Sequence, residues 1–377
     1  MRSNYKPLGE FIREVNKRDI HIAVDMLLGV SIQKKFIPSI ANIVGTDMST
    51  YKIIKRNQFA YGPVTSRNWD KISIALLDTF DEAIVSQSYT VFEVVNTTLL
   101  LPEYLMMWFR RPEFDRYARF KSHGSARETF DWEEMCKVEL PIPSIEIQKE
   151  IVTEYNVLIN RINLNNTLIE KLEDTAQTLY KQWFVDISDD LSDKDILNAY
   201  IELNPILTLK RWTQATYIEM SDVSTNKMSI GNSTIKRYDW GSRFQNWDTL
   251  LARITPCLEN WKTAYVSILN KNEVAFWSTE FIVMRARKNI SSYWVYCLAK
   301  DEDFRTYAIS SMVWSSWRQR VHEDYIKIYK LNKIEQVIMD KFDRLVSPIF
   351  ELIWNKSIEN QRLYNMNWIL LSRLATI

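Results

Sequence analysis

The sequence predicts an α+β protein in which two related α/β domains follow one another, each with a long helix after it. Three observations predict this fold. The chain repeats itself at an offset of 187 to 192 residues. Short β-branched runs alternate with helical patches in each copy, and each copy ends in a stretch with the apolar period of a coiled coil. We expect domains at 1–142 and 188–330, and long helices at 143–187 and 331–377.

The repeat is the strongest of these signals. Segment 67–94 (RNWDKISIALLDTFDEAIVSQSYTVFEV) resembles segment 259–286 (ENWKTAYVSILNKNEVAFWSTEFIVMRA). Downstream, three residues recur in the same spacing: Phe114, Tyr117 and Ala118 as Phe304, Tyr307 and Ala308. Two copies of this length are too few and too long for a solenoid, so each copy is predicted to be a globular domain with its own helix.

Local patterns predict the elements within each domain. The runs KISIALL (71–77) and AYVSIL (264–269) are apolar and bounded by turn residues, which is typical of strands. Segments 99–120 and 291–312 each have the pattern of one helix.

The two long segments have the 3.5-residue apolar period of a coiled-coil seam, and such a seam needs a partner helix. We therefore expect them to pair with each other. The predicted pairing residues are Ile151, Tyr155, Leu158, Ile162, Asn165, Leu172 and Leu179 in the first helix and Ile338, Phe342, Leu345, Leu363 and Leu370 in the second. A buried Asn165 would fix the register of the pair, whereas a partly exposed one would simply be tolerated at the helix surface.

Proline interrupts the second long segment at Ser347–Pro348. Proline inside a helix removes a hydrogen bond and clashes with the preceding turn. We expect either a kink here or a new helix that begins with Ser347 as its cap.

Composition excludes several classes of protein. Lys and Arg number 48 and Asp and Glu 47, a balance that excludes a histone-like polycation but allows DNA binding through local patches. The three cysteines lack zinc-site spacing, MRSNYKPLGE lacks the core of a signal peptide, and no run of about 18 apolar residues occurs. We expect a cytoplasmic protein that has free thiols, holds no metal and does not contact a membrane.

Glycine and tryptophan have unusual frequencies, with only 7 Gly but 14 Trp in 377 residues. Several tryptophans stand between polar turn formers, where chains ordinarily place glycine. The hypothesis is that some of these codons are read as glycine in the source lineage, as occurs where UGA is reassigned. The named positions are Trp69, Trp247, Trp261, Trp314 and Trp317. The alternative is a protein whose loop tryptophans stack on bases or fill an interface.

No catalytic constellation is visible in the sequence. The three histidines, His21, His123 and His322, are scattered, and neither a Gly-rich cofactor loop nor an N-P-P-Y-type loop occurs. Segment 256–263 (PCLENWKT) resembles a phosphate-binding loop only if Trp261 is glycine. Even then Pro256 replaces the first glycine and a strand-like run follows. We expect no catalysis and no cofactor on this chain.

Basic and amide side chains instead gather at the loops of both copies. Arginine can donate two hydrogen bonds to guanine or phosphate, and glutamine can pair with adenine. The candidate DNA-binding residues are Arg67, Lys121, His123 and Arg127 in the first copy and Lys210, Arg211, Arg243, Gln245, Arg253, Arg318, Gln319 and Arg320 in the second.

This arrangement resembles the specificity subunit of type I restriction–modification enzymes. The segment LPIPSIEIQKEIV (140–152), its continuation NNTLIEKLEDTAQTLYKQWF (165–184) and the echo NKSIENQRL (355–363) are similar to the two central repeats of that family. The loops GSARETF (124–130) and WSSWRQRV (314–321) match loops that are glycine-rich in the family.

The resemblance implies that each domain is a target recognition domain reading one half of an asymmetric, bipartite site in double-stranded DNA. It implies that the two helices pair as an antiparallel coiled coil and space the domains. The implied partners are two modification (methyltransferase) subunits and restriction (translocase/nuclease) subunits. S-adenosylmethionine, ATP and Mg would bind to those partners, and this chain would be noncatalytic.

Two other functions stay open at this point. One is a noncatalytic helical scaffold or adaptor whose domains bind protein rather than DNA. The other is a fused methyltransferase or nuclease, against which the missing cofactor and catalytic loops argue.

Overall fold

The computed structural model describes residues 4–20, 24–39, 45–66, 71–124, 127–186, 193–277, 279–315 and 318–376. The chain divides into two compact units. The first unit comprises Met1–Arg161 and Arg362–Ile377, and the second comprises Ile162–Gln361. Each unit therefore contains one domain and one part of each long helix. The domain boundaries expected from the sequence stay a prediction.

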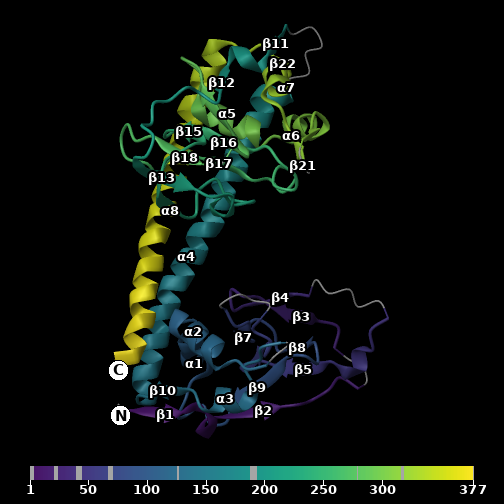
Figure 1. The fold of residues 1–377 in the computed structure, drawn as a ribbon, viewed down its shortest axis with the longest axis vertical. Helices are drawn as coiled ribbons and strands as arrows, with labels where there is room; N and C mark the ends of the chain where they lie inside the picture. Colours follow the sequence, from purple (N-terminus) through teal and green to yellow (C-terminus); the bar gives the residue numbers. More distant parts are fainter. Residues whose placement is uncertain are drawn as a thin grey trace. The chain divides into compact units, whose positions relative to one another are not determined.

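The described residues of the first unit form three sheets (Figure 1). Their strand orders are β2-β9-β6-β7, β4-β3-β8-β5 and β1-β10, and every neighbouring pair is antiparallel except β3 and β8. The strands are β1 (Tyr5–Pro7), β2 (Ile12–Val15), β3 (Leu27–Val30), β4 (Phe36–Pro38), β5 (Lys52–Lys55), β6 (Gln58–Tyr61), β7 (Ile74–Leu76), β8 (Glu82–Val85), β9 (Thr90–Val94) and β10 (Glu139–Pro141).

The second unit repeats this topology. Its sheets have the orders β12-β19-β16-β17, β14-β13-β18-β15 and β11-β22, again with one parallel pair, β13 and β18, and the hairpin β20-β21 is added. The strands are β11 (Lys194–Ile196), β12 (Ile201–Leu203), β13 (Gln214–Ile218), β14 (Thr234–Arg237), β15 (Ser242–Phe244), β16 (Thr249–Ala252), β17 (Thr263–Tyr265), β18 (Ala275–Trp277), β19 (Phe281–Ala286), β20 (Val313–Ser315), β21 (Arg318–Arg320) and β22 (Lys330–Asn332). The predicted tandem repeat of one fold is confirmed.

Two short helices replace each single helix that the sequence predicts over 99–120 and 291–312. In the first unit Pro112 begins a new helix, because proline fits the first turn but not a helix interior. In the second, the Asp301 carboxylate caps the new helix by accepting from the Asp303 and Phe304 amides. The short helices are α1 (Pro102–Phe109), α2 (Pro112–Lys121), α3 (Trp132–Cys136), α5 (Ser292–Ala299), α6 (Glu302–Ser310) and α7 (Glu323–Lys327).

Aromatic side chains fill the core of each domain. In the first, the Phe59 and Phe92 rings stack at 4.8 Å between centroids, and Phe109 of α1 meets Phe59 edge-on at 5.8 Å. In the second, Trp277 and Phe281 stack at 3.6 Å. Burying such rings removes large apolar areas from water, which stabilises each domain around its own sheets.

The long helices are α4 (Ile145–Tyr180), which ends in a π-helical turn over Lys181–Val185, and α8 (Gln336–Arg373). Within each unit they pack side by side (Figure 1). In the first unit, Tyr155 near the start of α4 belongs to the same core as Leu371 near the end of α8. In the second unit, Phe184 just after α4 meets Phe342 near the start of α8, with 5.0 Å between ring centroids. The predicted antiparallel pair is confirmed.

Most predicted pairing residues are buried or half-buried. Ile151, Tyr155, Ile162, Asn165 and Phe342 are buried, and Leu158, Leu172, Leu179, Ile338, Leu363 and Leu370 are half-buried. Leu345 is a correction, because it is 49% exposed while Val346 is fully buried. The shift has a physical cause. This part of α8 also packs on the domain, where Phe350 lies 4.5 Å from Tyr293 between ring centroids, so its buried face differs from that of a pure two-helix seam.

Helix α8 continues through Pro348, so the predicted restart at Ser347 is wrong. Packing of Phe342, Val346, Phe350 and Ile353, all buried, holds the helix on both sides of the proline. Tertiary burial thus outweighs the roughly 3 kcal/mol that a proline costs in a helix interior.

Candidate nucleic-acid interface

Three predicted arginines of the second domain gather around one carboxylate. The loop after β16 and the hairpin β20-β21 meet through backbone bonds. A β-bridge joins Ile254 to Arg320, and the Val321 amide donates to the Arg253 carbonyl at 2.9 Å. The Arg253 amide in turn donates to the Glu280 carbonyl at 3.0 Å. This backbone frame brings Arg253, Arg318, Gln319 and Arg320 to one place although 65 to 67 residues separate Arg253 from the others.

Glu280 organises the charges of this cluster. Arg320 donates two hydrogen bonds to the Glu280 carboxylate, from Nε at 3.0 Å and from Nη2 at 2.7 Å. The hydrogen bond from Arg320 is the largest influence on Glu280, and with the charges of Arg253 and Arg318 it holds the pKa of that carboxyl below its ordinary value. Three cations face one anion, so the cluster has a surplus of positive charge.

Two cations of this cluster are available for a ligand. Among the described residues neither Arg253 nor Arg318 forms an ion pair, and Arg318 is exposed. Arg253 Nε is buried without a hydrogen-bond partner. A buried guanidinium donor without a partner is costly. We name the set of Arg253, Arg318, Arg320 and Glu280 the arginine cluster.

The first domain builds an equivalent loop. His123 and Thr129 form a β-bridge like that of the β20-β21 hairpin, and the Thr65 amide donates to the Glu128 carbonyl at 3.0 Å. Gly124 has a φ of +132°, and a Cβ placed there would lie 2.2 Å from the Arg127 carbonyl oxygen. Only glycine fits at this position of the turn. At the repeat offset of 190 residues, the counterpart of Gly124 in the second domain is Trp314.

The predicted residues of this first loop are differently engaged. His123 and Arg127 are exposed, and Arg127 forms no ion pair among the described residues. Lys121 lies 3.9 Å from Glu134, a distance at which the pair is weak. Arg67 lies outside the described residues, as do Trp69 and Trp317.

The remaining predicted residues lie in other surroundings. Lys210 is exposed, and Arg211 pairs with Asp239 at 2.5 Å and lies over the Trp212 ring. The backbone amide of Gln245 donates to Asp248 at 2.8 Å. Arg243, on β15, has its Nε buried without a hydrogen-bond partner.

Sequence reasoning missed Glu280 and Arg237. The counterpart of Glu280 in the first copy, Ser88, carries no charge, so comparison of the two copies does not reveal Glu280. The Arg237 guanidinium lies over the Trp212 ring, 4.4 Å from the ring centroid. The same ring also contacts Arg211. The hairpin β13-β14 brings Arg237 there, and its signal was the basic run IKR that ends β14.

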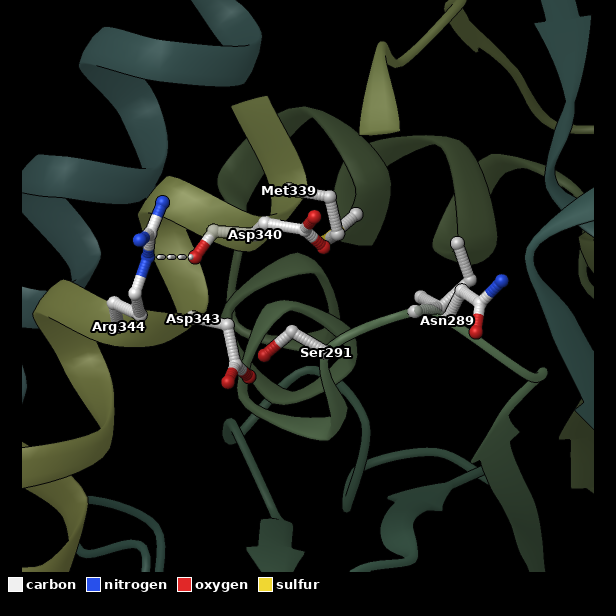
Figure 2. Close-up of a pocket in the computed structure, with 7 residues that line it drawn as sticks. Asn289, Ser291, Met339, Asp340, Asp343 and Arg344 are labelled. Carbon is white, nitrogen blue, oxygen red and sulfur yellow. Dashed lines mark hydrogen bonds between the residues drawn. The ribbon is translucent and has the colours of Figure 1, made fainter. Parts of the chain in front are cut away.

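Figure 2 shows an acidic pocket of about 490 Å³ in the second unit, between the start of α5 and the first turns of α8. Asp340, Asp343 and Arg344 line it together with Ser291, whose Oγ is buried without a hydrogen-bond partner. Its lining contains no histidine, cysteine or lysine, and Ser291 bonds neither carboxylate. It therefore lacks the paired nucleophile and base of a covalent catalyst.

Within the described ranges, no three side chains of His, Cys, Asp or Glu converge as metal ligands. Nor does any described helix combine the length and the apolar character needed to cross a bilayer.

Two domains of one fold, each with an arginine-bearing loop and each packed on the paired helices, define a class of tandem-repeat proteins. The comparisons specify this class. Residues 39–174 match the family model described as type I restriction modification DNA specificity domain. This stretch of the chain is thus similar to that DNA specificity domain.

Two relatives extend the similarity. The specificity subunit of the type I restriction enzyme HindI from Haemophilus influenzae is 28% identical over 188 residues, which are 48% of this chain and 40% of that protein. The specificity subunit of the type I restriction enzyme MjaIX from Methanocaldococcus jannaschii is 24% identical over 318 residues, 73% of this chain and 68% of that protein. The matched region thus spans less than half of the HindI protein and about two thirds of the MjaIX protein.

The fold agrees with a solved structure. The crystal structure of the type I restriction–modification S subunit from M. genitalium aligns with 98% of this chain and 95% of its own, with a TM-score of 0.56 and 13% identity. Residues 39–174 therefore resemble the DNA specificity domain of type I restriction–modification systems, and the chain as a whole shares the fold of this S subunit. The predicted resemblance is confirmed. Both relatives are specificity subunits of type I restriction enzymes.

Proposed function

We propose that this chain is the noncatalytic specificity subunit of a type I restriction–modification enzyme and that it recognises an asymmetric, bipartite site in double-stranded DNA. The observation that carries this proposal is the repeated topology, because two domains of one fold but different sequence can read two different half-sites. The paired helices α4 and α8 would act as the spacer. They would also dock two modification subunits, and restriction subunits would join the larger complex.

The arginine cluster supports DNA as the ligand. Phosphates are polyanions, and arginine donates to them in pairs. Its counterpart loop in the first domain presents His123 and Arg127. The other candidate DNA contacts are also proposals: Arg67, Lys121, Lys210, Arg211, Arg243, Gln245 and Gln319. No cofactor is assigned to this chain, and S-adenosylmethionine, ATP and Mg would serve the partner subunits in the cytoplasm.

Sequencing that detects methylated bases in the source genome tests the site. A split methylated motif with a constant gap would give both halves at once and supports the proposal. A genome that encodes active modification partners but carries no such motif contradicts it.

Binding of the identified DNA tests the contact residues. Arg318→Ala is expected to weaken binding and to reduce the slope of log K against log salt by about one, the effect of losing one phosphate contact. Arg13→Ala is the matched control, since the Arg13 guanidinium already donates to the Glu93 carboxylate, from Nε at 2.8 Å. If the wild-type chain shows no salt-sensitive DNA binding, the scaffold function replaces this one.

A further inference from the structure

A polar layer crosses the seam between α4 and α8 in the second unit. Asn165 of α4 is 2% exposed and Asn360 of α8 is 6% exposed. Asn165 Nδ2 donates to Asn360 Oδ1 at 2.9 Å, and Asn360 Nδ2 donates to Asn166 Oδ1 at 3.1 Å. Two adjacent residues of α4 thus hold one side chain of α8. The helices cannot slide along each other without breaking both hydrogen bonds.

This polar layer fixes one register of the helix pair and lowers the stability of the pair relative to an apolar layer. A buried amide is costly unless it is hydrogen-bonded, so any shifted register that separates the asparagines is penalised. Apolar side chains at the same positions would bury well in several registers. The observed burial decides between the two roles that the sequence left open for Asn165, because an exposed, tolerated asparagine would not be paired in the interior.

The same amide oxygen also binds the second domain. Lys227 Nζ donates to Asn166 Oδ1 at 2.9 Å. Lys227 lies in a lobe, residues 223–231, whose base is closed by the bridge between Val223 and Ile230. Asn166 therefore accepts one hydrogen bond from α8 and one from the domain.

A second anchor fixes this lobe two helical turns further along α4. The Met228 amide donates to Glu173 Oε1 at 2.8 Å, and the Tyr296 hydroxyl donates to Glu173 Oε2 at 3.2 Å. Residues 166 and 173 lie on one face of α4, since seven residues are close to two turns. The Met228 carbonyl accepts from the Tyr265 amide at 3.1 Å, which connects the lobe to β17.

The second copy of the helix lacks the layer. At the offset of 187 residues the counterparts of Asn165 and Asn166 are Leu352 and Ile353. Ile353 is fully buried and Leu352 is partly exposed. The link therefore belongs to one copy alone and is not a general feature of the repeat.

We propose that Lys227, Asn166 and Asn360 form a positioning link that seats the second recognition domain at one place on the helix pair while holding the pair in one register. The inference rests on the proposed function, since seating a recognition domain matters for the gap between two DNA half-sites. The three side chains position the domain and do not themselves contact DNA.

Hydrogen exchange of the full-length chain tests the link without DNA. Asn360→Leu is expected to speed amide exchange in peptides covering residues 223–231 by about fivefold, the size of a coupling within one hydrogen-bond network. Asn365→Leu, at an exposed position on the same helix, is the matched control and should leave this lobe unchanged. Equal exchange in Asn360→Leu and in the control overturns the link.

A second variant keeps the test decisive if Asn360→Leu does not fold. Lys227→Met leaves the asparagine layer intact and is expected to speed exchange in the α8 peptide around Asn360 by a similar factor, because coupling is reciprocal. Unchanged exchange there also overturns the link. If neither variant folds, the side chains act in stability alone and the positioning role is wrong.

Binding to DNAs whose half-sites lie one base pair closer or further apart tests positioning. The wild-type chain should prefer one gap, and Lys227→Met should bind the neighbouring gaps within about twofold of the original. A folded variant that keeps the wild-type preference overturns the positioning role. A wild-type chain that binds no split site contradicts the proposed function instead, while the exchange result still decides whether the link exists.

Discussion

Tryptophan occupies backbone conformations in this protein that its side chain disfavours. Among the described residues, eight that are not glycine have positive φ, and Trp212, Trp247 and Trp261 are three of them. For residues with a Cβ this region costs roughly 1–2 kcal/mol. The first copy of the repeat has the same turn with a different residue at this position. Asn57, the counterpart of Trp247, has φ +68° against +75°. The Asn57 amide donates to the Leu77 carbonyl and the Trp247 amide to the Val266 carbonyl, each at 2.8 Å.

Asparagine and glycine suit such a turn, whereas tryptophan does not. This geometry supports the hypothesis that the codons for Trp247 and Trp261 are read as glycine. Trp314 does not have a positive φ, but its counterpart Gly124 does. The coding DNA decides the question, because UGG codons at these positions would rule out the reassignment.

Substitutions at Trp247 measure the backbone effect directly. Trp247→Gly is expected to be more stable than Trp247→Ala by about 1 kcal/mol, because both lose the ring and only alanine retains the left-handed penalty. At Trp240, exposed and without a positive φ, alanine should equal or exceed glycine. Urea unfolding of the four variants gives both differences. The same order at both positions would contradict the argument.

Acid unfolding tests the charge balance at Glu280. Its pKa is lowered in the folded state, chiefly by the hydrogen bond from Arg320, so the carboxylate stabilises the fold above its ordinary value of 4.5. This contribution is lost as pH falls through the lowered pKa. Glu280→Gln should therefore be less stable than the wild type at neutral pH and should lose less stability below pH 4.5.

The control for this experiment is Glu259→Gln, an exposed glutamate in the same domain. Its urea midpoint should follow the wild-type curve across the same pH range. A Glu280→Gln curve parallel to that of the wild type would mean that Arg320 does not stabilise the carboxylate.

At the scale of elements, the two long helices owe their form to packing rather than to local preference. Pro348 lies on an exposed face of α8, where it lacks the amide that would donate to the Arg344 carbonyl. The buried residues on both sides keep the helix continuous. Propensity is a weak signal when an apolar face of this length is buried.

Pro348→Ala should therefore stabilise the protein. The gain is about 2 kcal/mol, which is the roughly 3 kcal/mol interior penalty less the roughly 1 kcal/mol of entropy that alanine returns to the unfolded chain. This corresponds to a melting temperature several degrees higher. Asn355→Ala, at an exposed position of the same helix, should shift it little. A lower melting temperature for Pro348→Ala would show that the packing requires a bend at the proline.

At the scale of the whole molecule, the repeat predicts separable recognition. Each domain has its own core and its own sheets. Replacing residues 1–142 with the domain of another specificity subunit should change one half of the DNA site and leave the other half unchanged. Sequencing of the methylated motif in cells that carry the hybrid measures this. Loss of methylation at every sequence would favour the scaffold function.

The reciprocal exchange of residues 188–330 is the control and should change the other half alone. Because the polar layer at Asn360 lies outside both exchanged segments, the helix register should persist in each hybrid. The lobe with Lys227 is removed in the second exchange, so a shifted gap is expected there and not in the first.

Periodicity and repetition in the sequence by themselves determined the tandem fold, the two long helices and their pairing. Apolar spacing is a local property of the sequence, and the same spacing occurs in both copies. The same reasoning found Arg253, Arg318 and Arg320 as separate candidates. Only the tertiary structure decided that they surround Glu280, since a β-bridge between distant segments brings them together. It also decided that Val346 replaces Leu345 in the seam and that Asn165 meets Asn360. These outcomes depend on whether α4 or the domain packs against a given face of α8. The residue spacing within one helix does not contain that information.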